Sequence, residues 1–150
     1  MDDNRFISFT NLVSSLNRVI FLIKEEETQK YELKSMHVSC LYNLYRFNAL
    51  TQVELIELCE ENKAAISRTL CYLIDNGYVK IDNPDAKYKK SYSLTKKGIE
   101  MSEIIQNRVN SILEKASGSI PVIDRKKMYE CLRKIDENLR EIITQNNKSR

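Results

Sequence analysis

Apolar residues recur at steps of three and four along most of the chain, the spacing that places them on one face of an α-helix. The first such run predicts an amphipathic helix that ends near the acidic residues 25–27. A second run predicts a helix over residues 34–47, with Val38, Leu41, Leu44 and Tyr45 on one side. The apolar positions of the first helix are Phe6, Phe9, Leu12, Val13, Leu16, Val19, Ile20 and Ile23.

Two shorter helices are predicted in the middle of the chain. Thr51 is followed three residues later by Glu54, the spacing of a capping box in which each residue satisfies an amide of the other's turn. This helix is over by Glu61, and Asn62, a favourable N-cap residue, begins the next one. Gly77 ends that helix, because glycine tolerates the left-handed conformation after a helix C-terminus. The sequence therefore predicts two helices joined by a tight turn.

A β-hairpin is predicted directly after these helices. Residues 78–81 and 91–94 are short runs with β-forming composition, and the Asp-Asn-Pro-Asp sequence at 82–85 has turn chemistry. Two short helices followed by a hairpin are typical of a winged helix-turn-helix. In that module the second helix enters the DNA major groove and the hairpin, or wing, reaches the flanking backbone.

Two long amphipathic helices are predicted to end the chain. Thr95 caps the first, residues 118–121 interrupt the pattern, and the second covers about 124–143. The predicted fold class is mainly α with a small β-wing, a winged helix-turn-helix flanked by long dimerisation helices. We interpret residues 1–150 as a single domain with a DNA-binding lobe at 34–97 and dimerisation helices at 1–30 and 98–146.

The distribution of charge supports contact with a nucleic acid. The net charge of the whole chain is only +3. From Asn62 to Lys97, however, eight basic and three acidic residues give a local charge of +5, and the remainder of the chain carries −2. The positive segment coincides with the second short helix and the hairpin, where a phosphate backbone would lie.

The helix that begins after Asn62 has a second face besides its apolar stripe. Ala64, Arg68 and Cys71 lie almost opposite the core positions, with Ala65, Ser67 and Tyr72 on the flanks. Alanine lets the backbone approach base edges, and Ser67 can bond to a base or a phosphate. Arg68 can reach guanine O6 and N7 as a bidentate pair. An isolated helix of this kind is also typical of plain helix propensity, but the preceding helix, the hairpin and the +5 segment favour recognition.

The tip of the predicted hairpin is strongly basic. Lys87, Lys89 and Lys90 surround Tyr88 and can lie along phosphates or the adjacent minor groove. The alternative interpretation is a charged edge that blocks pairing with other strands. The two interpretations are compatible.

The motif set resembles that of the multiple-antibiotic-resistance regulator (MarR) family of bacterial transcription factors. It comprises LTQ-E opening the first short helix, K-A-A-I-S-R in the second, NGYV entering the wing and LT-K-G leaving it. The resemblance covers nearly the whole chain. It implies a homodimer that binds a palindromic operator in double-stranded DNA, usually as a repressor. By the family's pattern, the positions facing bases and phosphates are Lys63, Ala64, Ala65, Ser67 and Arg68.

The wing departs from that pattern. Family members usually carry Asp-Arg-Arg or Asp-Lys-Arg eight residues before the leucine of the LT motif, and here Ala86, Lys87 and Tyr88 occupy this place. The aspartate that orients the wing arginine is missing. We therefore expect the wing to supply mostly charge, with the helix selecting sequence.

Dimerisation also has support from the pattern itself, because long amphipathic helices at both ends need another surface to bury against. The resemblance further implies release by a small phenolic or aromatic effector, and several aromatics of the first two helices can either line a pocket for it or belong to the core. These are Phe6, Phe9, Phe21, Tyr31, Tyr42, Tyr45 and Phe47.

The remaining chemistry narrows the function classes. The four cysteines form no CxxC pair and are interpreted as reduced thiols, mostly in the core, which places the protein in a cytoplasm. Cys40, with His37 nearby to lower its pKa, and Cys71 are the candidates for an oxidation sensor, with inert thiols as the alternative. A single histidine makes a metal site unfavourable.

No membrane-spanning segment is predicted. No cofactor site or catalytic set of residues is predicted either, so an enzyme is disfavoured. A winged-helix module that binds a protein partner remains the alternative class.

Overall fold

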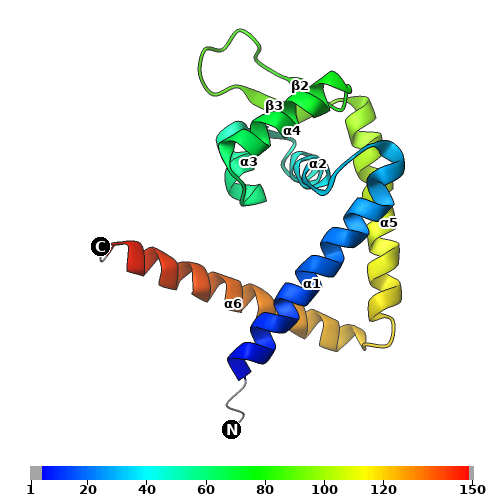
Figure 1. Cartoon of the computed structure of the whole chain (residues 1–150), viewed down its shortest axis with the longest axis vertical. Helices are drawn as coiled ribbons and strands as arrows, with labels where there is room; N and C mark the ends of the chain where they lie inside the picture. The colour runs from blue at the N-terminus through cyan, green and yellow to red at the C-terminus, as the bar shows by residue number, and fades with distance from the viewer. Residues whose placement is uncertain (1–4, 149–150) are drawn as a thin grey trace. The chain divides into compact units, whose positions relative to one another are not determined.

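The computed structural model describes residues 5–148, and side chains from residue 7 onward. Within these limits the chain is mainly helical with one small sheet (Figure 1). It divides into two compact units, residues 1–109 and 110–150. The elements are α1 (Arg5–Thr28), the 3-10 turn η1 (Gln29–Tyr31), α2 (Ser35–Phe47), β1 (Ala49–Thr51), α3 (Gln52–Cys59), α4 (Lys63–Asp75), β2 (Val79–Ile81), β3 (Ser91–Leu94), α5 (Lys96–Ser117) and α6 (Val122–Lys148).

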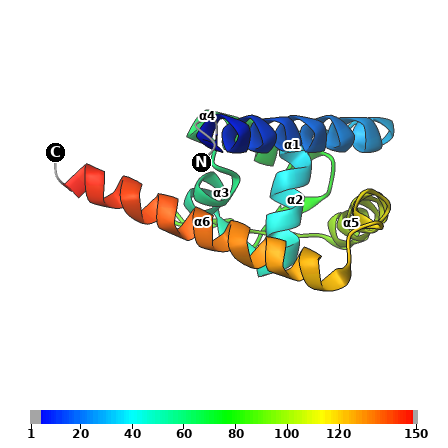
Figure 2. The same cartoon turned by 90° about the horizontal axis from the view of Figure 1, so that it is seen from below.

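The core of the first unit lies where α2, α3 and α4 meet. Leu41 and Leu44 of α2, Leu55 of α3, and Ile66 and Leu73 of α4 are fully buried there. Burying each such side chain contributes about 1.5–3 kcal/mol. Helix α2 crosses α1 steeply, which leaves α3 and α4 to pack on its other sides (Figures 1 and 2). Of the apolar positions predicted for α2, Val38, Leu41 and Leu44 are buried and Tyr45 is exposed. In α3 Leu55 is buried, whereas Val53 and Leu58, which also belong to its apolar pattern, are exposed.

The ends of the short helices follow the predicted signals. The Thr51 hydroxyl oxygen accepts the Glu54 amide, and Glu54 Oε2 accepts the Thr51 amide at 2.7 Å, which completes the capping box. Asn62 Oδ1 accepts the Ala65 amide at 2.8 Å and caps α4. Gly77 has φ +72°, and the amides of Gly77 and Tyr78 donate to carbonyls of the last turn of α4. This is the Schellman arrangement that glycine favours.

The sheet has three strands, one more than predicted. Its order is β1-β3-β2, and both pairings are antiparallel. In the hairpin Val79 lies opposite Leu94 and Ile81 opposite Tyr92. The additional strand β1 places Leu50 opposite Tyr92 on the other edge of β3. The wing is therefore joined to the segment between α2 and α3 by backbone hydrogen bonds.

The long helices agree with the prediction except at their boundaries. Helix α6 begins at Val122, directly after Pro121, and extends to Lys148, beyond the predicted range of about 124–143 at both ends. Many apolar side chains on α1 and α6 are exposed in the single chain, among them Leu12, Leu16, Leu132, Leu139 and Ile142. No helix within residues 5–148 has the length and hydropathy to cross a membrane.

Candidate nucleic-acid interface

A tight turn places α4 directly after α3. Glu60 adopts the left-handed conformation, with φ 54°, and its amide donates to carbonyls of the last turn of α3. The Glu61 amide donates to the Ile56 carbonyl, and α4 begins two residues later at Lys63. The predicted helix-turn-helix is thereby confirmed, with a glutamate at the position where glycine is more common.

The predicted reading residues lie together at the first two turns of α4. Lys63, Ala64, Ser67 and Arg68 are exposed, and Ala65 is half-buried. Asn62 Oδ1 accepts the hydrogen bond of the Ala65 amide. The amides of Lys63 and Ala64 are therefore the donors of the first turn of α4 that have no partner in the described chain. Such donors at a helix N-terminus favour an anion. Residues 5–148 provide no hydrogen bond or ion pair to the Arg68 guanidinium, so it is available for a ligand.

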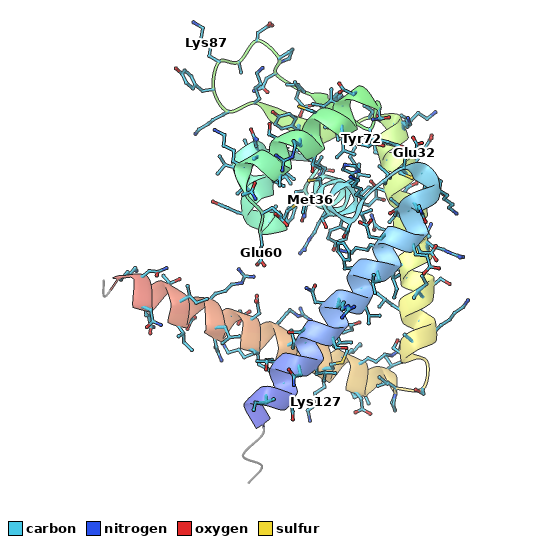
Figure 3. All side chains as sticks on the ribbon, viewed as in Figure 1. Glu32, Met36, Glu60, Tyr72, Lys87 and Lys127 are labelled. Atoms are coloured by element: carbon cyan, nitrogen blue, oxygen red, sulfur yellow. The ribbon has the colours of Figure 1, made fainter. Side chains whose placement is uncertain are left out.

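One flank of α4 is bonded to the elements beneath it. The Tyr72 hydroxyl donates to the Glu32 carbonyl oxygen at 2.7 Å (Figure 3), and the Tyr72 ring stacks on His37 with centroids 4.2 Å apart. Tyr72 is half-buried, which agrees with its predicted place on a flank of the reading face. Its function here is to hold α4 against α2 and the α1–α2 connection.

The wing loop between β2 and β3 carries exposed basic residues. Side-chain hydrogen bonds hold the two ends of this loop together. Asn83 Oδ1 accepts the Ser91 amide at 2.8 Å, and Asn83 Nδ2 donates to the Lys89 carbonyl at 3.2 Å. Asp82 accepts the hydroxyls of Ser91 and Ser93. Lys87, Lys89 and Lys90 are exposed, and Lys87 lies at the outer end of the loop (Figure 3). Tyr88 is 85% exposed. Sequence reasoning missed Asp82 and Asn83 as organisers of the wing, although Asx residues in turns were a signal.

The start of α5 is attached to the turn between α4 and β2. The Thr95 hydroxyl donates to the Gly77 carbonyl oxygen at 2.6 Å and accepts the Gly98 amide at 3.1 Å. Lys97 Nζ donates to the Asn76 carbonyl oxygen at 2.7 Å and lies 4.3 Å from the centre of the Tyr78 ring. Lys97 was counted in the positive segment, but its ammonium group bonds to the C-terminal end of α4 instead.

The cysteines differ from the prediction in both burial and partner. Cys71 and Cys131 are exposed, so the thiols are not mostly core residues. Buried Cys40 contacts Cys59 and not His37, and the hydrogen bond to Cys59 together with burial raises the Cys40 pKa. His37 Nδ1 accepts the Lys34 amide at 3.0 Å, and burial lowers the His37 pKa. Residues 5–148 contain no group of three metal-ligating side chains.

Most aromatics of the first two helices are exposed in the described chain. Phe9, Phe21, Tyr42 and Phe47 are exposed, and the Phe6 side chain lies outside the described residues. Tyr31 alone among the seven lines a cavity of about 120 Å³, together with Glu27, Lys30, Ile104, Ile105 and Arg108. Across this cavity Arg108 Nε donates to Glu27 Oε2 at 2.6 Å.

Comparison with known proteins supports the fold. No protein-family model and no curated protein sequence matches the chain. Solved structures match with high similarity of fold. Staphylococcus aureus MarR in complex with salicylate and kanamycin has 20% identity and a TM-score of 0.83, over 93% of this chain and 95% of that one. A MarR transcriptional regulator from Methanosarcina mazei Go1 has 22% identity and a TM-score of 0.81, over 95% and 94%.

One structural neighbour is bound to DNA. A mutant of MarR from E. coli complexed with operator DNA has 20% identity and a TM-score of 0.73, over 90% of this chain and 99% of that one. The chain therefore has the winged helix-turn-helix fold of MarR family transcriptional regulators. Because the identities are low, these comparisons establish the fold alone.

Proposed function

We propose that this protein is a DNA-binding transcriptional regulator, a repressor that binds a palindromic operator as a homodimer and is released by a small-molecule effector. The observation that carries the proposal is the exposed, unpaired Arg68 beside Ser67 and the two alanines on the first turns of α4. This composition suits close approach to base edges in the major groove. The proposal rests on the fold as well, which is shared with a protein bound to operator DNA.

In the proposed complex the residues of α4 contact different parts of the DNA. Arg68 bonds to O6 and N7 of a guanine, Ser67 bonds to an adjacent base or phosphate, and Lys63 neutralises a phosphate. Ala64 and Ala65 keep the helix close to the groove floor. Tyr72, on the flank of α4, holds the helix against α2.

The wing is proposed to contact the DNA backbone beside this site. Lys87, Lys89 and Lys90 supply charge, and the bonds made by Asn83 hold the base of the loop. A lysine bonds to phosphates as a point charge and does not present the fork that reads bases. The wing should therefore add affinity without adding sequence selectivity.

A homodimer is proposed because α1 and α6 each expose apolar stripes that a single chain leaves in water. A two-fold axis would present two copies of α4 to successive major grooves and would make the operator palindromic. Light scattering at micromolar concentration should give twice the chain mass of 17.6 kDa. A monomer under these conditions would remove the dimer from the proposal.

The effector is proposed to be a small phenolic or aromatic acid. The cavity lined by Tyr31 and Arg108 supports this, since it offers an aromatic ring and a guanidinium whose present partner, Glu27, the ligand's carboxylate would replace. The solved complex of S. aureus MarR with salicylate supports the ligand class. Salicylate should weaken DNA binding by the wild type, and unchanged affinity at millimolar salicylate would argue against this part.

Selection of bound DNA from a random pool tests the function. We expect a consensus with two inverted half-sites whose centres are about 10 base pairs, or a multiple of that, apart. The alternative is a module whose basic face binds an acidic protein. Enrichment of no sequence, together with salt-sensitive binding to all DNA, would favour that alternative.

A further inference from the structure

Two cysteine sulfurs from the neighbouring helices α2 and α3 lie close together. Cys40 Sγ of α2 is 3.9 Å from Cys59 Sγ, at the last residue of α3. Cys40 is fully buried and Cys59 is half-buried. A disulfide requires about 2.05 Å between the sulfurs, so rotation of the two side chains and a small approach of the helices would be needed. We propose that Cys40 and Cys59 are a reversible dithiol switch that forms an intramolecular disulfide on exposure to a hydroperoxide.

The hydrogen bonds around the pair assign different functions to the two thiols. Asn43 Nδ2 donates to the Ser39 carbonyl oxygen at 3.0 Å and to Cys59 Sγ at 3.6 Å. The bond to a carbonyl identifies this Asn43 atom as the amide nitrogen, so Cys59 Sγ accepts it. Either sulfur can donate the S–H···S contact while both are thiols, and Cys40 is the donor once Cys59 has lost its proton. Both bonds stabilise the Cys59 thiolate and lower its pKa, the Cys40 contact most strongly.

The more accessible sulfur is therefore also the more nucleophilic one. The Cys59 thiolate attacks an oxygen of the hydroperoxide, the O–O bond breaks, and Cys59 becomes a sulfenic acid while an alcohol or water leaves with a proton. Cys40 sulfur then attacks Cys59 sulfur. The S–S bond forms, and hydroxide leaves as water with the Cys40 proton. The two thiols together give two electrons to the peroxide, and a cellular dithiol can reverse the reaction.

Closure of this bond would act on the start of α4. Cys59 is followed directly by Glu60, whose left-handed conformation begins the turn into α4. Drawing Cys59 toward α2 moves that turn, because packed interiors transmit such shifts. Oxidation should therefore disturb the placement of Arg68 on DNA. This consequence rests on the proposed function, whereas formation of the disulfide does not.

The chemical step is tested in protein carrying Cys71→Ser and Cys131→Ser, which removes the exposed thiols. After treatment with hydrogen peroxide the intact mass should fall by about 2 Da and return with dithiothreitol. Trypsin cuts after Lys34, Arg46 and Lys63, so the two cysteines fall on separate peptides that only a disulfide would join.

The control adds Cys59→Ser, which is tolerable at a half-buried position and should abolish the linked peptides. Circular dichroism checks that each variant remains helical. A natively folded protein that keeps both thiols, or that gains about 32 Da at Cys59 without a linked peptide, would overturn the proposal.

The regulatory step is tested on the DNA site selected by the reduced protein. Oxidation should weaken binding on the order of tenfold, or about 1.4 kcal/mol, and Cys59→Ser should be insensitive. Disulfide formation with unchanged affinity would contradict the coupling between the pair and α4. A reduced protein that selects no DNA would instead contradict the proposed function and leave the mass result standing.

Discussion

Gly98 lies so close to Tyr78 that a β-carbon at position 98 would come within 2.0 Å of the Tyr78 carbonyl oxygen. That same oxygen accepts the Thr95 amide at 3.0 Å. The first turn of α5 therefore packs directly on the backbone that leaves α4. The glycine of the LT-K-G motif and the tyrosine of NGYV, which are far apart in the sequence, are two sides of one contact.

Gly98→Ala should therefore destabilise the protein, although alanine is the better helix former. The clash is with backbone, which cannot rotate away, so we expect the free energy of unfolding to fall by about 1–3 kcal/mol. Urea denaturation measures this. Gly77→Ala is the contrast, because a β-carbon at Gly77 meets nothing within 4 Å and only the left-handed backbone opposes it. A Gly98→Ala protein as stable as the wild type would refute the contact.

Stability should also fall in mildly acidic solution because of His37. Burial, and secondarily Lys34, lowers the pKa of His37 below its usual 6.5, while Glu25 partly opposes this. The unfolded chain therefore binds this proton first. Stability is full above about pH 6.5 and decreases as the pH falls from there toward the folded-state pKa. Protonation of Nδ1 would also remove the acceptor of the Lys34 amide.

Comparing urea denaturation at pH 7.5 and pH 5.5 tests this effect, since His37 is the sole histidine of the sequence. The His37→Gln protein should be less stable at pH 7.5 but should lose less on acidification than the wild type. Equal losses in the two proteins would assign the acid sensitivity to other groups.

The wing lysines should contribute to affinity through phosphates alone. Replacing Lys87, Lys89 and Lys90 by alanine should weaken binding to specific and non-specific DNA by similar factors. The slope of log affinity against log salt should fall by about 2–3, since each lost phosphate contact accounts for about 0.9. Fluorescence anisotropy over a range of salt concentrations measures it.

A matched control removes the same charge from the other compact unit, through alanine at the exposed Lys126, Lys127 and Lys148 of α6. This variant should keep the wild-type slope. If both triple variants changed the slope equally, the wing would have no particular contact with DNA.

Local signals in the sequence predicted most of the fold. The capping box of Thr51, the Asn62 cap and the Gly77 terminus each depend on residues within a few positions, and each is confirmed. Strand β1 was missed because its three residues pair only through backbone bonds to β3, which is distant in the sequence. No pattern of neighbouring residues predicts such a long-range pairing.

The candidate site was predictable only in part, for a similar reason. The exposed edge of α4 follows from helical periodicity, and Ala64, Ser67 and Arg68 are exposed as the pattern predicts. The partner of Lys97 and the contact between Cys40 and Cys59 depend on how helices pack. Spacing along the chain carries no information about such distances.

The central claim is that the exposed edge of α4 selects DNA sequence. Its most direct test repeats the selection from a random pool with the Arg68→Ala protein and compares the two consensus sequences. We predict that one position in each half-site loses its preference for guanine, at a cost of about 1–3 kcal/mol on the original site, while the other positions persist. An unchanged consensus bound with wild-type affinity would contradict the claim.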